Sequence, residues 1–116
     1  MSSIQIIKGS AQIALPEDRG HVAKPISQPP CSLSGQSLDL GAISQRAGLW
    51  ECSPGSFRRD VKEGEVMHML SGTCTFKPDS GDEIRIGAGD TVFFPPNTGG
   101  VWTVETTIRK VYVIVG

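Results

Sequence analysis

The side chains best suited to chemistry lie near the middle of the chain, where Arg58, Arg59 and Asp60 precede Glu65. A carboxylate facing a guanidinium forms a mutually neutralising pair, which can also clamp a planar polar ligand through two hydrogen bonds. Glu65 and Asp60 could instead share acid–base chemistry, because burial of neighbouring carboxyl groups raises the pKa of one of them. A structural ion pair with no ligand is an equally open interpretation.

The two histidines, His21 and His68, are weak candidates for ligands or catalytic bases. Side chains alternate between the faces of a strand, so Glu65 and Met67 share one face and His68 takes the other. If Glu65 points inward, His68 points outward, toward an adjacent sheet, the N-terminal segment or a partner subunit. Neither histidine lies near a serine or cysteine in a pattern typical of a catalytic triad.

Three cysteines, Cys31, Cys52 and Cys74, form neither a disulfide framework nor a zinc motif, because their number is odd and no CxxC pair occurs. We expect small buried thiols. The sequence also contains no Gly-x-Ser-x-Gly elbow, phosphate-binding loop or dinucleotide-binding glycine motif. The region around Glu65 is therefore left as the candidate site.

Short strands must position these residues, since the chain carries 14 glycines and 8 prolines and shows no helical periodicity. Turn signals separate apolar segments at intervals of about 8–12 residues, which is typical of an antiparallel sandwich or small barrel. The central hairpin should place Met69, Cys74 and Phe76 on its inner face. The expected strands are 49–52, 65–70, 73–77, 83–86, 91–94, 101–105 and 109–115.

The first 45 residues differ in character from the rest, and we predict an N-terminal arm over 1–45 followed by a barrel over 46–116. Residues 4–7 and 11–15 are candidate short strands. Residues 17–38 are rich in proline, serine, glycine and glutamine, and prolines favour extended backbone without hydrogen bonds. This stretch either packs along a barrel or a partner subunit, or forms a loose tail.

Several segments of the chain resemble the two cupin signature motifs. Glu65 precedes Gly72 at the family spacing, and Gly89 precedes Pro95 as in the second motif. More narrowly, four segments are similar to the ureidoglycine-aminohydrolase-like branch of the cupins. The resemblance covers roughly residues 47–115 and implies an all-β double-stranded β-helix, the cupin jelly roll. The four segments are GLWECSPGSFR at 48–58, GDTVFFP at 89–95, GVWTV at 100–104 and RKVYV at 109–113.

The same resemblance implies four metal ligands, of which this chain keeps one. Glu65 occupies the glutamate position, and the histidine position of the second motif falls on Gly100. A tightly bound metal needs three or four converging donors. We therefore expect no cofactor, beyond a weak divalent cation at Glu65 that Asp60 could join. The His-x-His pair falls on Arg58 and Asp60, or on Arg59 and Val61, depending on the spacer length.

The sequence thus predicts a small cupin that binds a small polar metabolite in its barrel without a tightly bound metal. Two alternatives stay open: an enzyme related to ureidoglycine aminohydrolase with a reduced or relocated site, and a structural dimerisation module. Trp50 and Tyr112 are assigned to the core or to an interface. The candidate ligand-binding residues are Glu65, Arg58, Asp60, Met67 and Trp102.

Composition bears on partners and location. A net charge of −1 gives no electrostatic reason to bind nucleic acid or a membrane surface. No apolar run approaches the roughly 18 residues of a membrane span, and the first residues lack a signal-peptide pattern. We expect a cytoplasmic protein. We also expect a homodimer, because edge strands of small barrels are usually paired or covered.

Overall fold

The computed structural model describes residues 4–115, which form eight antiparallel strands and no helix. The expected all-β architecture is confirmed. None of these residues belongs to a helix long and apolar enough to cross a membrane. The strands are β1 (Glu17–His21), β2 (Ser32–Ser37), β3 (Arg46–Cys52), β4 (Gly55–Val61), β5 (Gly64–Pro78), β6 (Ile84–Gly87), β7 (Thr91–Phe94) and β8 (Thr98–Val115).

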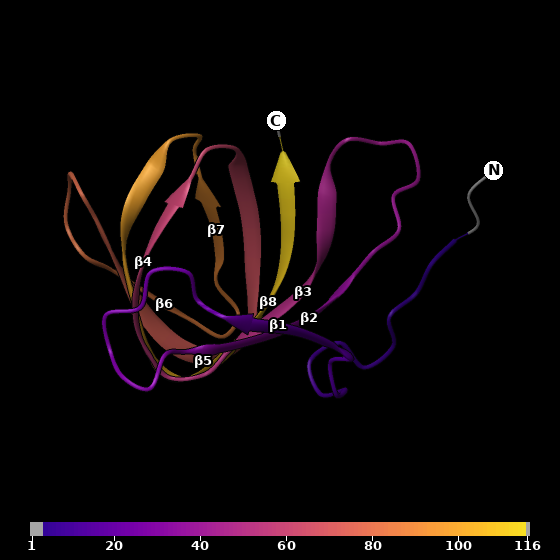
Figure 1. Ribbon diagram of the computed structural model, residues 1–116. Helices are drawn as coiled ribbons and strands as arrows, with labels where there is room; N and C mark the ends of the chain where they lie inside the picture. Colours follow the sequence, from indigo (N-terminus) through magenta and orange to yellow (C-terminus); the bar gives the residue numbers. More distant parts are fainter. Residues whose placement is uncertain (1–3, 116) are drawn as a thin grey trace.

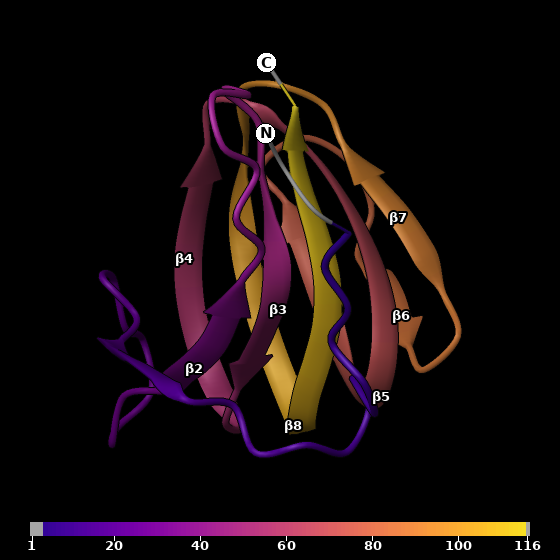
Figure 2. The same ribbon diagram turned by 90° about the vertical axis from the view of Figure 1, so that its right-hand side faces the viewer.

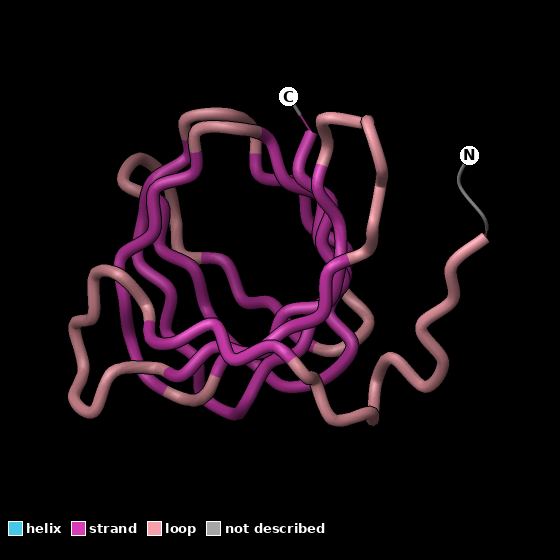
Figure 3. Tube along the Cα trace, turned by 45° about the vertical axis from the view of Figure 1, so that its right-hand side comes forward, coloured by secondary structure: helices cyan, strands magenta, loops and turns pink. Residues whose placement is uncertain are grey.

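Two long strands, β5 and β8, pair with each other along their lengths and belong to both halves of the barrel. On one side of β8, β3 pairs with the second half of the strand and β4 with the first half. On the outer side of β5, β7 pairs with the first half and β6 with the second half. The sheet therefore curves into the open barrel seen in Figures 1 and 3.

The corner of the barrel lies where the β5–β8 register shifts, between Met69 and Cys74. Gly72 sits at this corner with a φ of +87°, a conformation that favours glycine. A Cβ atom there would overlap the carbonyl oxygen of Thr107 and lie 2.8 Å from the Cα of Ile108. The bend thus depends on the close approach of two strand backbones.

The barrel interior contains the side chains that strand alternation predicted. Met67, Met69, Cys74 and Phe76 are all buried, and His68 lies on the outer face, as expected. The hairpin expected at 65–77 is wrong, because β5 continues through the bend at Gly72 and pairs with β8 on both sides of it. The aromatic rings fill one end of the interior: the Phe76 centroid lies 4.6 Å from that of Phe94 and 5.2 Å from that of Trp102. The three cysteines are free and buried, also as expected.

The N-terminal third differs from the strand prediction. Residues 4–7 and 11–15 form no strand, whereas β1 and β2 arise within the proline-rich stretch. Strands can form there because Pro25, Pro29 and Pro30 all lie in the connection between β1 and β2, where their missing N–H donors break no ladder. Since β2 pairs with β3, this stretch packs on the chain's own barrel and is not a loose tail.

The segment before β1 runs across the outer face of the sheet, beside β8 (Figure 2). Arg109 donates a hydrogen bond from Nη1 to the carbonyl oxygen of Ser10, at 3.0 Å. The backbone N–H of Asp39 donates to Oε1 of Gln5, at 2.8 Å. Tertiary hydrogen bonds therefore hold this segment in place without a strand ladder.

Candidate functional site

A cavity of about 240 Å³ opens at the barrel mouth, where β1, β3, β4, β5 and β8 meet. The volume corresponds to about eight water molecules at ~30 Å³ each, which suits a small metabolite. Its lining is unusual in containing four cationic side chains and a single carboxylate. The lining residues are Arg19, Arg46, Trp50, Arg59, Glu65, Lys110, Tyr112 and Ile114.

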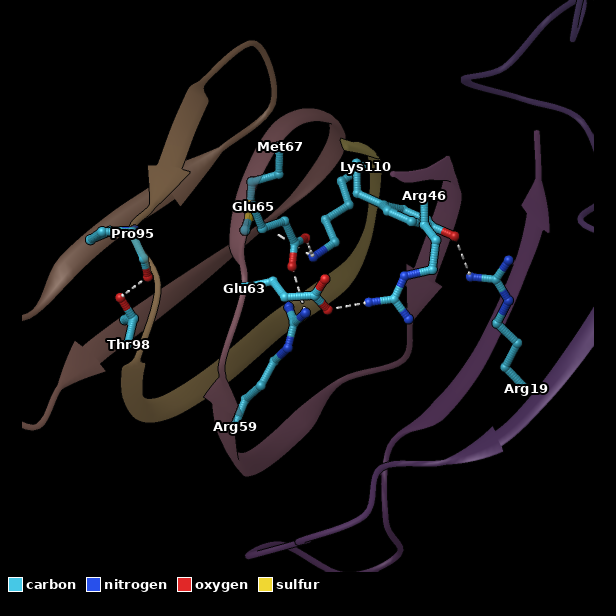
Figure 4. A network of polar contacts seen from close by, with 10 residues as sticks. Arg19, Arg46, Arg59, Glu63, Glu65, Met67, Pro95, Thr98 and Lys110 are labelled. Atoms are coloured by element: carbon cyan, nitrogen blue, oxygen red, sulfur yellow. Dashed lines mark hydrogen bonds and ion pairs between the residues drawn. The ribbon is translucent and has the colours of Figure 1, made fainter. Parts of the chain in front are cut away.

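Glu65 lies at the centre of the charged groups and is only 1% exposed. Its Oε2 accepts a hydrogen bond from Nζ of Lys110 at 2.8 Å, and its Oε1 accepts one from Nη2 of Arg59 at 2.5 Å. Figure 4 shows the two cations reaching this carboxylate from different strands, β8 and β4. Each carboxylate oxygen is thus engaged by a positive charge.

Lys110 is the buried cation of the site and is 1% exposed. Its Nζ lies 4.4 Å from the ring centroid of Trp50 and 5.7 Å from that of Trp102, so both aromatic faces stabilise the ammonium. Burial nevertheless lowers the pKa of Lys110 to about 8, despite the opposing attraction of Glu65. For Glu65, burial alone would raise the pKa, but Lys110 and Arg59 outweigh it and hold that pKa below its usual 4.5.

Two further arginines stand at the rim and are held by acids outside the cavity lining. Arg46 pairs with Glu63 at 2.6 Å. Arg19 pairs with Glu17 at 2.7 Å and donates to the hydroxyl of Tyr112 at 3.3 Å. Arg59 makes only the bond to Glu65 within the described part of the chain, which leaves most of its five N–H donors free for a ligand.

Of the five sequence-predicted site residues, Glu65, Met67 and Trp102 lie inside the barrel, and Arg58 and Asp60 lie on its outer face. Arg58 pairs with Asp79 at 2.6 Å and with Asp60 at 2.8 Å, away from Glu65. Alternation along β4 explains this placement, because the buried Phe57 and Val61 flank Arg59 on the inner face. The guanidinium that meets Glu65 therefore belongs to Arg59 rather than to Arg58.

Trp102 is fully buried, and its indole N–H has no hydrogen-bond partner among the described residues. An unsatisfied buried donor costs about 1–3 kcal/mol. Its ring stacks on Phe94 with centroids 5.6 Å apart. Met67 is also fully buried, with its sulfur 3.9 Å from Nζ of Lys110.

A family model for the EutQ-like cupin domain matches residues 42–112, more than half of the chain. The chain belongs to the EutQ-like cupin family. No curated protein matches it. Solved cupins support the same fold. This EutQ-like cupin is similar to a putative ethanolamine utilization protein Q from Salmonella typhimurium LT2, with 19% identity, a TM-score of 0.71 and coverage of 97% of this chain and 85% of that one.

Two other solved structures extend the comparison. The Clostridium difficile EutQ protein matches with 17% identity and a TM-score of 0.63, over 80% of this chain and 76% of that one. A protein with unknown function of the DUF861 family, from Pseudomonas syringae pv. tomato str. DC3000, matches with 24% identity and a TM-score of 0.78. That match covers 89% of this EutQ-like cupin but only 45% of the Pseudomonas chain. At these identities the likeness shows the fold.

The donor set of this EutQ-like cupin does not fit the metal that many cupins hold. Both oxygens of Glu65 already accept hydrogen bonds from cations, whose charge repels a metal ion. Within residues 4–115 no three His, Cys, Asp or Glu side chains converge. A histidine at position 100 would also be excluded sterically, because a Cβ on Gly100 would overlap the carbonyl oxygen of Lys77 and lie 2.6 Å from Phe76.

The sequence pattern assigns no role to Lys110 and predicts that Trp50 and Tyr112 are core or interface residues. All three line the cavity. One signal was present: Arg109 and Lys110 are adjacent in a strand, so alternation must turn one of two cations inward. Arg19 and Arg46 carried no such signal, because long-range pairing of β1, β2 and β3 brings them to the rim.

A second cavity, of about 410 Å³, lies between β6, β7 and the start of β8. Its lining is mainly apolar, and Asp79 is the one charged residue in it. Because Asp79 already pairs with Arg58, this second cavity offers little for chemistry. The charged cavity at the barrel mouth is therefore the candidate functional site.

Proposed function

We propose that this protein binds a small anionic metabolite at the barrel mouth, without a metal ion. The observation that carries the proposal is the cavity lining, in which cations from β1, β3, β4 and β8 converge around a single carboxylate. A carboxylate or phosphate ligand would be recognised by the planar fork of Arg59, whose remaining donors have no partner among residues 4–115. Arg46 and Arg19 would then close over the ligand from the rim.

The aromatic walls narrow the class of ligand. Trp50 and Tyr112 line the same cavity as the cations, and ligand pockets typically combine such apolar walls with a few polar groups that fix orientation. The cavity volume of about 240 Å³ is below the roughly 300–1,000 Å³ of drug-sized sites. We therefore favour an anion of a few carbon atoms over a nucleotide or cofactor.

A thermal-shift screen of short carboxylates and inorganic phosphate tests this proposal. An anion that binds the folded state should raise the Tm by mass action. Arg59→Gln should abolish the shift, and Arg58→Gln is the matched control because its guanidinium lies one residue away on the outer face. Loss of the shift in Arg58→Gln alone, or no shift with any anion in the unaltered protein, would overturn the assignment.

The narrower kinship to the ureidoglycine-aminohydrolase-like branch is part of the proposal and rests on the four sequence segments at 48–58, 89–95, 100–104 and 109–113. Enzymes of that branch need a metal held by histidines. Here Gly100 stands at one of those positions, and either Arg58 and Asp60 or Arg59 and Val61 stand at the His-x-His pair. We infer shared ancestry rather than shared activity. Stoichiometric manganese, iron, nickel or zinc that survives dialysis of the purified protein would favour the enzyme instead.

We further propose a homodimer formed through the outer face of the β7–β5–β8–β3 sheet. Apolar side chains lie opposite one another there: Val66 of β5 is the register partner of both Phe93 and Val113, and Val113 is the partner of Ala47. Val66 and Phe93 remain 38% and 57% exposed. A second copy packed on this row would cover them.

Free cysteines persist in a reducing compartment, which supports a cytoplasmic location.

A further inference from the structure

We propose that Lys110 is a nucleophile that forms a reversible imine with a short 2-oxo acid held at the barrel mouth. This inference rests on the proposed anion binding and names its ligand class. It is carried by the placement of a primary amine on the wall of a cavity, beside a carboxylate and an arginine that reach it from two other strands.

The buried ammonium of Lys110 is not explained by stability alone. Nζ of Lys110 lies among Met67, Trp50 and Trp102, and replacing a buried ion pair with apolar residues of similar volume is often neutral or stabilising. A methionine at position 110 together with a leucine at position 65 would fill this space with neither charge to bury. The presence of an amine at the cavity wall therefore points to a chemical role.

The surroundings of Lys110 favour a reactive amine. The groups facing Lys110 are Glu65 from β5, Arg59 from β4 and Cys52 from β3. Burial and the neighbouring Arg59 lower the pKa of Lys110 to about 8, from the ordinary 10.5. An amine activated by desolvation and a second cation is the arrangement that carbonyl-attacking lysines use.

The spacing of Arg59 and Lys110 indicates the class of ligand. Arg59 and Lys110 contact the two oxygens of one carboxylate, so their donor atoms lie close together in the cavity. A ligand that carries a carboxylate and a carbonyl group on adjacent carbons would reach both donors, with its carboxylate at Arg59 and its carbonyl carbon at Lys110. A 2-oxo acid satisfies this condition, and a cavity of about 240 Å³ accommodates a short one.

The reaction balances without a further reactant. A proton passes from the Lys110 ammonium to Oε2 of Glu65 across their hydrogen bond. The amine lone pair then forms a C–N bond to the carbonyl carbon, and the carbonyl π electrons move to oxygen. That oxygen takes one proton from the attacking nitrogen and one from Glu65, leaves as water, and yields an iminium. The iminium replaces the ammonium as the cationic partner of Glu65.

Reductive trapping tests the proposal. The purified protein is incubated with pyruvate or glyoxylate and sodium cyanoborohydride, and the alkylated lysine is located by peptide mass mapping. We expect Lys110 to be labelled about tenfold more than the exposed Lys24, because Arg59 would hold the carboxylate of the oxo acid beside Lys110. Arg59→Gln should reduce the labelling, and Arg58→Gln should leave it unchanged.

Lactate provides a control that does not depend on the folding of a variant, because it carries the carboxylate but no carbonyl group. Lactate should protect Lys110 from trapping and should still raise the Tm. Labelling spread over surface lysines, with Lys110 unmodified, would overturn the imine. If pyruvate and lactate both raise the Tm while Lys110 stays unmodified, anion binding stands and the imine is wrong. If neither raises the Tm and Lys110 stays unmodified, both proposals are wrong.

Discussion

At the scale of single residues, the barrel mouth is organised around Glu65 and its two cations. Lys110 and Glu65 bury their charged groups almost completely, and Arg59 remains 28% exposed. Burial of charge is costly, and the mutual attraction of the pair offsets that cost only while both partners are present. The contribution of the Glu65–Lys110 pair to stability can therefore be measured by mutation, separately from any chemistry at Lys110.

We expect Lys110→Met to lower the free energy of unfolding by about 3 kcal/mol, because it leaves the buried carboxylate with Arg59 as its one remaining cation. The double variant Glu65→Leu/Lys110→Met should lie within about 1 kcal/mol of the unaltered protein, since it removes both charges. Urea unfolding of Lys110→Met, Glu65→Leu and the double variant measures the coupling free energy between Glu65 and Lys110. Additive losses would show that Glu65 and Lys110 do not stabilise each other.

At the scale of elements, β5 and β8 decide the geometry of the site. Their pairing shifts register between Met69 and Cys74, and this irregularity bends both strands between the two halves of the barrel. Glu65 and Lys110 face each other because they lie on the same side of this corner. The close approach of the backbones at Gly72 is therefore a condition for the site as well as for the fold.

Gly72→Ala should lower the free energy of unfolding by at least about 2 kcal/mol, because the left-handed conformation and the overlap with Thr107 act together. Gly87→Ala is the matched control, since its nearest neighbours to a new Cβ lie 3.8 Å away and its φ requires no glycine. Chemical denaturation monitored by circular dichroism compares the two variants. Equal stability of Gly72→Ala and Gly87→Ala would mean that the corner relaxes freely.

At the scale of the whole molecule, the segment before β1 covers part of the outer sheet and leaves the row of Phe93 and Val66 open. Exposed apolar patches of this kind commonly mark an interface. The first strands, β1 and β2, belong to the barrel wall, so removal of residues 1–38 would also remove Arg19 and expose β3. A surface substitution therefore tests the dimer more cleanly than truncation.

We expect sedimentation equilibrium to show a dimer for the unaltered chain and a monomer for Val66→Glu, because the new carboxylate would be buried between the two copies. Ile26→Glu is the control, since Ile26 is 59% exposed in the connection between β1 and β2. Both variants should keep their strand content by circular dichroism. A monomeric unaltered chain would refute the dimer.

Local sequence features determined several strands of the barrel and the faces on which their side chains lie. Glycine and proline punctuation with period-two alternation predicted β3, β6 and β7, and it placed Glu65, Met67 and Met69 inside and His68 outside. It missed β4, and it divided the continuous strands β5 and β8 into two strands each. The sequence also showed that the metal-binding histidines of the cupin motifs are missing, because those motifs have a definite spacing. These features depend on neighbouring residues in one strand, whose side chains must alternate whatever the rest of the chain does.

The tertiary structure alone decided which cations meet Glu65. Arg58 and Arg59 are adjacent, and a shift of one residue in the β4–β8 register would exchange their faces. Lys110 reaches Glu65 across 45 residues of sequence, through β5–β8 pairing that shifts at the corner. Arg19 lies at the rim of the cavity because β1 pairs with β2, and β2 pairs with β3. Such placements depend on strand register and bulges between distant segments, which alternation within one strand does not specify.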